Sequence, residues 1–141
     1  MRAVNGYEGS VRFELLKNQS IRETIKFSWC VYGGFLLLNL IIFYLFLPYF
    51  LGVHFPVWVG LFIESIGLWC LVSTLFKSTH RKFAVYEVYV IEKDEGDSES
   101  PCRVKDMDSD WQHVSYDLFK QLEIGHSYLV FGDSKSLLYL Y

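Results

Sequence analysis

Two long runs of apolar residues constrain the fold of this 141-residue chain more than any other feature of its sequence. Residues 27–53 contain no charged side chain, and residues 55–76 contain only Glu64. A helix rises about 1.5 Å per residue, so about 20 apolar residues cross the roughly 30 Å hydrocarbon core of a bilayer. The remaining residues are too few to cover two helices that are apolar on every face. We therefore predict two transmembrane helices, over about residues 27–50 and 56–76, rather than buried core helices.

The link between these two runs is short. Pro48 and Pro56 bracket it, and proline interrupts the hydrogen bonding of a helix. Gly52 lies between them and permits the chain to reverse direction. Residues 27–76 are thus expected to form a transmembrane helical hairpin. The first run is too long and begins too late for a signal peptide, so we expect no cleavage.

The basic residues around the hairpin predict its orientation. Five Lys or Arg residues precede the first span, three follow the second, and the link contains none. Positive charge is retained on the cytoplasmic side of a membrane. We therefore expect a multi-pass protein of the plasma (bacterial inner) membrane with both termini in the cytoplasm.

Residues 1–26 are expected to form a cytoplasmic N-terminal segment. Between residues 10 and 26 apolar and basic positions are interspersed, which indicates a juxtamembrane amphipathic helix, either with an interfacial role or as a simple anchor. Ser20 and Glu23 have the spacing of a capping box, so a helix is expected to restart at Ile21 and continue into the first span. Residues 1–9 are expected to be a loose end.

Residues 83–141 have a different character and predict a small cytoplasmic β-domain. Strands are expected over 83–91, 102–105, 111–114, 127–131 and 137–141, with an acidic loop over 93–101. Ser115 can cap a short helix that extends through Leu122, with Gly125 as its stop. The last two strands are expected to pair as a hairpin. The expected fold class is therefore α+β: a transmembrane hairpin followed by an antiparallel sheet or small β-barrel, SH3-like or OB-like.

The two halves of the chain carry opposite charge. Residues 1–82 hold 8 Lys and Arg against 4 Asp and Glu, whereas residues 83–141 hold 5 against 12. The net charges of +4 and −7 sum to −3 for the chain. Nucleic-acid binding depends on cations that neutralise phosphate, so an acidic domain argues against a nucleic-acid partner. The acidic face is either simply solvated or contacts a basic protein.

Glu64 is the most informative single residue because a carboxylate at the bilayer centre is costly, by roughly 2.5–3.5 kcal/mol. Asn39 is expected at a similar depth on the other span, and Ser65 is adjacent. One hypothesis is a proton or cation site, or a contact to another membrane subunit. The other is a protonated carboxyl that bonds to Asn39 and holds together the hairpin or a dimer.

Four glycines are candidates for close helix packing. Gly33 and Gly34 are adjacent on the first span, and Gly60 and Gly67 lie seven residues apart on the second. Small residues at such spacing let membrane helices approach closely. The alternative is the ordinary tolerance of glycine in membrane helices.

The sequence contains no motif for catalysis, a cofactor or a small-molecule substrate. Its three cysteines and four histidines show no spacing typical of a metal site, and no CxxC pair occurs. We therefore expect a protein that is not an enzyme, with no catalytic residue, metal or cofactor. Cys30 and Cys70 are interpreted as inert buried thiols or as acylation sites near the interface.

These observations predict a non-enzymatic interaction protein, an accessory or regulatory subunit of a membrane complex, with the β-domain as docking module. Its expected partners are the lipid bilayer and another membrane protein or a second copy of itself. One alternative is a transport or ion-conducting component that oligomerises around Glu64. Another is a bacterial toxin-immunity protein whose spans meet the toxin in the membrane.

Overall fold

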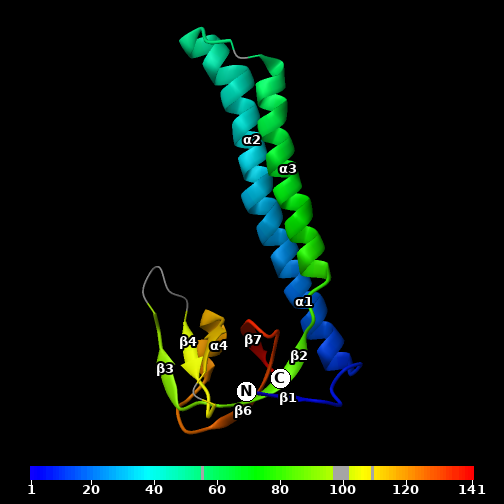
Figure 1. Cartoon of the computed structure of the whole chain (residues 1–141), viewed down its shortest axis with the longest axis vertical. Coiled ribbons are helices and arrows are strands. Elements are labelled where there is room, and N and C mark those ends of the chain that lie inside the picture. Colours follow the sequence, from blue (N-terminus) through cyan, green and yellow to red (C-terminus); the bar gives the residue numbers. More distant parts are fainter. Residues whose placement is uncertain (55, 97–101, 109) are drawn as a thin grey trace. The chain divides into compact units, whose positions relative to one another are not determined.

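The computed structural model describes residues 1–54, 56–96, 102–108 and 110–141. The fold is α+β, with a long N-terminal helical run, a second apolar helix and a seven-stranded mixed sheet (Figure 1). The chain divides into two compact units: the sheet unit, residues 1–20 and 81–141, and the helical unit, residues 21–80. The expected acidic loop over 93–101 lies partly outside the described residues, and its first two residues are not loop, because they pair with β4 (Arg103–Lys105) as part of strand β3 (Glu92–Asp94).

The first helical run is continuous through four segments. They are α1 (Val11–Ser28), the π-helical η1 (Trp29–Gly33), α2 (Gly34–Ile41) and the π-helical η2 (Ile42–Leu51). The expected restart at Ile21 is wrong, because Ser20 lies inside α1 and is buried. The expected break at Pro48 is also wrong. Pro48 lies within η2, where the wider turn has already replaced α-helical hydrogen bonds.

The run ends where the sequence allows the backbone to reverse. Gly52 follows η2 with a φ of 62°, and its N–H donates to the Leu47 carbonyl. A left-handed residue at this position ends a helix, and glycine adopts that conformation without steric cost. The second helix, α3 (Val57–Thr79), begins directly after Pro56. The first run has 41 residues and α3 has 23, and both are long and apolar enough to cross a membrane.

The sheet contains seven strands in the order β1-β2-β6-β7-β5-β4-β3. Their bounds are β1 (Arg2–Val4), β2 (Ala84–Tyr89), β3 (Glu92–Asp94), β4 (Arg103–Lys105), β5 (Trp111–Val114), β6 (Ser127–Gly132) and β7 (Ser136–Leu140). The expectation of a wholly antiparallel sheet is wrong, because β5 and β7 are parallel. The hairpin of β6 and β7 is confirmed, but β7 inserts between β6 and β5 and so runs alongside β5 in the same direction.

The short helix α4 (Tyr116–Gln121) connects β5 to β6. Its expected cap is confirmed: the Ser115 Oγ accepts a hydrogen bond from the Leu118 N–H at 3.3 Å. Gly125 is not its stop, since the helix already ends at Gln121 and Gly125 instead donates its N–H to the Val90 carbonyl at 2.8 Å. The helix covers one face of the sheet and completes the core. That core consists of Val88, Val90, Val104, Val114, Leu118, Leu122, Val130 and Leu137.

The first twenty residues belong to the sheet unit rather than to a separate segment. The expected loose end contains β1, which pairs antiparallel with β2. At the start of α1, Phe13 is buried. Its ring packs edge-on against the Phe131 ring, with 5.2 Å between the ring centres. The Ser10 hydroxyl, which accepts from the Phe13 N–H, also bonds to the Tyr141 hydroxyl at 2.6 Å. The beginning of α1 is therefore anchored on the sheet by aromatic packing.

Candidate functional site

The contact between α3 and the first helical run is built on small residues of α3. Its buried residues are Gly60, Gly67, Leu71 and Ser78, whose spacing of seven, four and seven is that of a packing seam along one face. A Cβ at Gly60 would lie 2.7 Å from the Tyr44 hydroxyl oxygen. Any side chain there would therefore require the Tyr44 ring to move.

Gly67 makes the same kind of close contact about two turns further along α3. A Cβ at Gly67 would lie 2.8 Å from a methyl carbon of Leu36 and 3.3 Å from the Phe35 ring. Gly33 and Gly34 are placed differently. Among the described residues, a Cβ at Gly34 would meet no atom within 4 Å, and one at Gly33 would meet only Trp29 of its own helical run. Of the four candidate glycines, Gly60 and Gly67 are therefore the pair at the interhelical contact.

Glu64 lies at the edge of this seam and is half-buried, four residues after Gly60 and three before Gly67. Gly60 lies against Tyr44 and Gly67 lies against Leu36, so the part of the first run that is level with Glu64 falls between Leu36 and Tyr44. The turn that contains Asn39 is midway between them, so Asn39 and Glu64 lie at about the same depth of the helical pair.

The expected hydrogen bond between Asn39 and Glu64 is nevertheless not made. The Asn39 amide donates to the Phe35 carbonyl of its own helix at 3.0 Å. Ser65 also turns to its own helix and donates to the Leu61 carbonyl at 2.7 Å. Within the described residues, the Glu64 carboxylate has no hydrogen-bond or ion-pair partner. The structure thus brings Asn39 and Glu64 to one level without joining them.

A chemical difference explains why Glu64 stands apart from the other polar groups of the helical unit. Hydroxyl and amide groups can donate to a carbonyl one turn earlier in their own helix. Among the described residues, the side chains that do so include Ser28, Asn39, Ser65, Thr74, Ser78 and Thr79. An ionised carboxylate only accepts, and the carbonyls around it offer no donor. Glu64 therefore has to find its partner outside its own helix.

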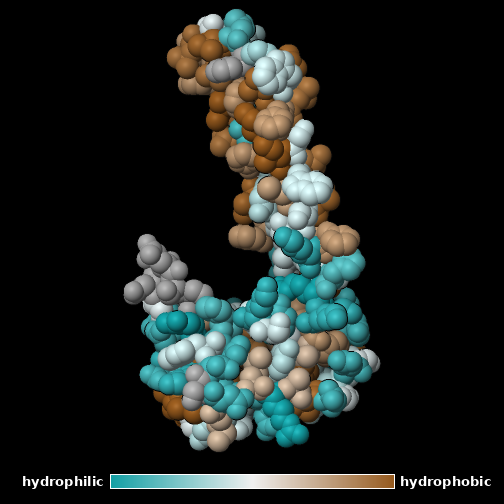
Figure 2. Space-filling model, in the orientation of Figure 1, coloured by the Kyte–Doolittle hydropathy of each residue, from teal (hydrophilic) through white to brown (hydrophobic). Residues whose placement is uncertain are grey.

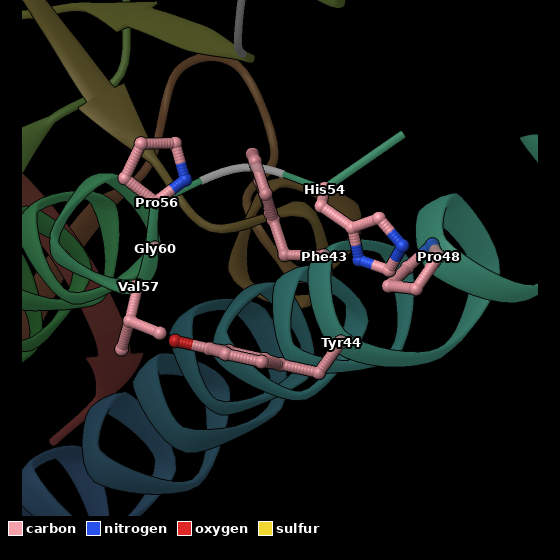
Figure 3. A pocket seen from close by; sticks show the side chains of 7 residues that line it. All are labelled: Phe43, Tyr44, Pro48, His54, Pro56, Val57 and Gly60. Atoms are coloured by element: carbon pink, nitrogen blue, oxygen red, sulfur yellow. The ribbon is translucent and has the colours of Figure 1, made fainter. Parts of the chain in front are cut away.

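A small cavity lies where the hairpin turns, and sequence reasoning did not single it out. It has a volume of about 190 Å³ and is lined by residues of η2, the link and α3 (Figure 3). Its polar groups are the Tyr44 hydroxyl, which points toward Gly60, and the His54 imidazole beside Pro48 (Figure 3). The sequence contains the two residues that matter here, the aromatic Tyr44 and Gly60, but only the register of the two helices shows that they lie opposite each other.

In the sheet unit, Asp133 and Arg81 form the best-defined ion pair. The Arg81 guanidinium donates two hydrogen bonds to one Asp133 oxygen, at 2.5 and 2.8 Å. The other oxygen accepts from the backbone N–H groups of Lys135 and Ser136 at 2.9 and 2.8 Å. Burial alone raises the pKa of Asp133, but Arg81 and these N–H groups outweigh it and hold the pKa below its usual value. Every acceptor direction is used, so this cluster is structural.

Asp106 is a buried carboxylate with a cation and a backbone N–H group as partners. It accepts from the Tyr89 N–H at 3.0 Å and pairs with the α-ammonium group of Met1. Burial raises the pKa of Asp106. The ammonium group and the N–H groups of Met107 and Tyr89 lower this pKa by more than burial raises it, so that it lies below its usual value. Neither this pair nor the Arg81 pair leaves a group free to act on a substrate.

Metal-binding chemistry finds no support in the described parts of the chain. No group of three or more His, Cys, Asp or Glu side chains is close enough there to hold a metal ion. The three cysteines are free thiols, and Cys30 is exposed rather than buried as one interpretation expected.

Comparison with known proteins finds no matching family, no matching curated protein and no matching solved structure.

Proposed function

We propose that this chain is an integral membrane interaction protein, an accessory or regulatory subunit whose helical unit spans the bacterial inner membrane as a hairpin. The sheet unit is its cytoplasmic docking module. The observation that carries this proposal is the exposed apolar surface of the helical unit.

That surface extends around both helices. None of the most apolar 18-residue window of the first run is buried, and only 17% of the corresponding window of α3 is. Leu37, Leu61 and Trp69 are all more than half exposed. Brown, hydrophobic side chains gather over the helical unit, whereas the sheet unit shows far more hydrophilic surface (Figure 2). Soluble proteins rarely expose a contiguous apolar surface of this extent to water, whereas the hydrocarbon core of a bilayer covers it.

The basic residues on both sides of the hairpin support a common cytoplasmic location for the N-terminus and the sheet unit. Lys26 lies in the last turn of α1 and Lys77 in the last turn of α3. The link between η2 and α3 has no Lys or Arg to compete with them.

Trp111 is the side chain of the sheet unit best suited to contact a partner. It is 38% exposed, and the Arg103 guanidinium and Lys105 ammonium lie 5.3 and 5.8 Å from its ring centre. Tryptophan and arginine dominate the energetics of protein interfaces. Of the other aromatic residues of the strands, Tyr89 is exposed, whereas Tyr86 and Tyr128 pack against the core.

Two experiments test the proposal. Alkaline carbonate extraction of cell membranes is expected to leave the full chain in the pellet, and its recovery in the supernatant would refute membrane insertion.

Chemical cross-linking in cells with mass spectrometry is expected to capture a stoichiometric membrane subunit, and Trp111→Ala should abolish that capture. Tyr116→Ala is the control, since Tyr116 is 53% exposed and lies outside the Trp111 cluster. Equal capture by both variants would refute docking through Trp111.

A second function, transport or ion conduction, is favoured by the unpartnered carboxylate of Glu64. A half-buried acidic group in a membrane helix is a common element of proton and cation pathways. Purified chain in liposomes should then carry a pH-dependent flux that Glu64→Gln abolishes. Absence of flux in the unchanged protein excludes this function.

A further inference from the structure

We propose that a second copy of this chain packs in parallel on α3, so that Glu64 of each copy bonds to Glu64 of the other. The juxtaposition that carries this inference is an unpartnered carboxylate at the centre of an exposed apolar stripe. The inference rests on the proposed membrane insertion of the helical unit.

The stripe runs along α3 beside the packing seam. Val57, Leu61, Leu68 and Val72 are spaced by four, seven and four residues, and each is more than half exposed. Glu64 follows Leu61 by three residues and precedes Leu68 by four, so it lies on the same side of the helix. We call these five residues the Glu64 stripe. Its branched apolar side chains are of the kind that pack between helices.

The carboxylate needs a donor that this copy of the chain does not supply. It has no partner among the described residues, and the neighbouring amide of Asn39 donates to Phe35. No other charged residue occurs between residues 27 and 76, so no Lys, Arg or His of either helix can approach it within the spans. Leaving it unpaired in hydrocarbon costs roughly 2.5–3.5 kcal/mol on insertion scales.

A second copy supplies the donor at the correct depth by symmetry alone. All copies insert with the same orientation, so a two-fold axis along the membrane normal places both Glu64 residues at one level. Two carboxyl groups that share one proton are complementary. The O–H of one donates to the carboxylate oxygen of the other, and the pair carries one negative charge instead of two. A foreign subunit would need an independently matched donor, and for this reason we assign the stripe to self-association.

Cysteine cross-linking of the full chain in native membranes tests the geometry. Cys30, Cys70 and Cys102 are first replaced by Ser, and Leu68→Cys or Ile66→Cys is then added. Leu68 lies on the Glu64 stripe, whereas Ile66, also 50% exposed, is two residues away and faces nearly the opposite side of α3. Oxidation is expected to give a homodimer of twice 16.6 kDa through Leu68→Cys and not through Ile66→Cys.

Substitution of Glu64 in the Leu68→Cys background tests the chemistry. Glu64→Gln keeps a donor and an acceptor and should retain the dimer, whereas Glu64→Leu should reduce dimer formation about 3- to 30-fold, the range expected for an interhelical hydrogen bond. Glu64→Lys should abolish self-pairing but pair with the unchanged chain when the two are co-expressed.

The outcomes separate this inference from the proposed function. A chain that resists carbonate extraction but stays monomeric, cross-links equally at both positions or cross-links to a different protein overturns the inference and leaves membrane insertion intact. A dimer that tolerates Glu64→Leu without loss overturns the role of the carboxyl pair. A chain released by carbonate overturns the proposed function as well.

Discussion

The two units of this protein place the same kinds of side chain in opposite environments. In the sheet unit, Leu118 of α4 is 1% exposed, whereas Leu68 of α3 is 54% exposed. The sheet unit gains its stability as water is excluded from a packed core. The helical unit keeps most of its apolar surface outside, so it needs an apolar solvent or a partner to cover that surface.

The two units also differ in how completely their polar groups find hydrogen-bond and ion-pair partners. In the sheet unit, the buried Asp106 and the partly buried Asp133 each have a cation and backbone N–H groups as partners. In the helical unit, hydroxyl and amide groups bond to their own helices, and the Glu64 carboxylate has no partner among the residues that the structure describes. A unit with its apolar side chains packed in a core and a unit that leaves most of its apolar surface exposed are thus joined in one chain.

The sharpest test of this comparison removes one phenylalanine from each unit. Phe131 is fully buried and its ring stacks on Phe83 at 5.2 Å. Phe131→Ala is expected to destabilise the sheet unit by about 3–5 kcal/mol, because it leaves a cavity in the core. Hydrogen exchange of β6 in detergent-solubilised full chain measures the loss. Phe62→Ala, at a position 65% exposed in α3, is the control and should leave β6 exchange unchanged.

The Arg81–Asp133 pair should make the sheet unit sensitive to acid. The pKa of Asp133 is lowered in the folded state, so its contribution is present above the unfolded pKa of about 3.9 and is lost as pH falls through the folded pKa. Asp133→Asn should cost roughly 1.5–3 kcal/mol at pH 7 and almost nothing well below pH 3. Urea titrations at both pH values measure this difference. An equal loss at the two pH values would contradict the assignment.

The glycines of the helical unit provide a matched pair of positions. Gly67→Val adds atoms where Leu36 and Phe35 already touch the backbone, and overpacking of this kind costs roughly 1–3 kcal/mol. Gly34→Val adds the same atoms in open space. Thermal aggregation of the purified chain in detergent should shift to lower temperature for Gly67→Val alone. Identical shifts would show that the seam does not hold the hairpin.

The smallest expected effect concerns the cap of α4. Ser115→Ala removes the acceptor for the Leu118 N–H and should cost about 1 kcal/mol. Exchange of the α4 amides should accelerate accordingly, while the amides of α3 serve as an internal reference. Ser115→Asp, which restores an acceptor, should recover most of the protection.

The features that the sequence predicted correctly are those with a local cause. A run of about 20 or more apolar residues favours a helix, which satisfies its own backbone hydrogen bonds. Gly52 reverses the chain through its own backbone freedom, and the Ser115 hydroxyl caps the helix that follows it. Strands β4 and β5 and the hairpin of β6 and β7 are likewise set by alternation and by the turn beside them. The restart at Ile21 failed because a local capping signal was outweighed by continuous helix on both sides.

The rest depended on pairings between residues distant in the chain. No local signal brings Arg2–Val4 onto β2, sets Phe13 against Phe131, or inserts β7 parallel to β5. The candidate site shows the same division. Composition alone singled out Glu64, but only the register of the two helices distinguished Gly60 and Gly67 from Gly33 and Gly34. The sequence also did not show that Asn39 bonds to Phe35 of its own helix. Solvation and backbone chemistry act within a few residues and can be read along the chain, whereas register is decided by complementary surfaces that meet only after folding.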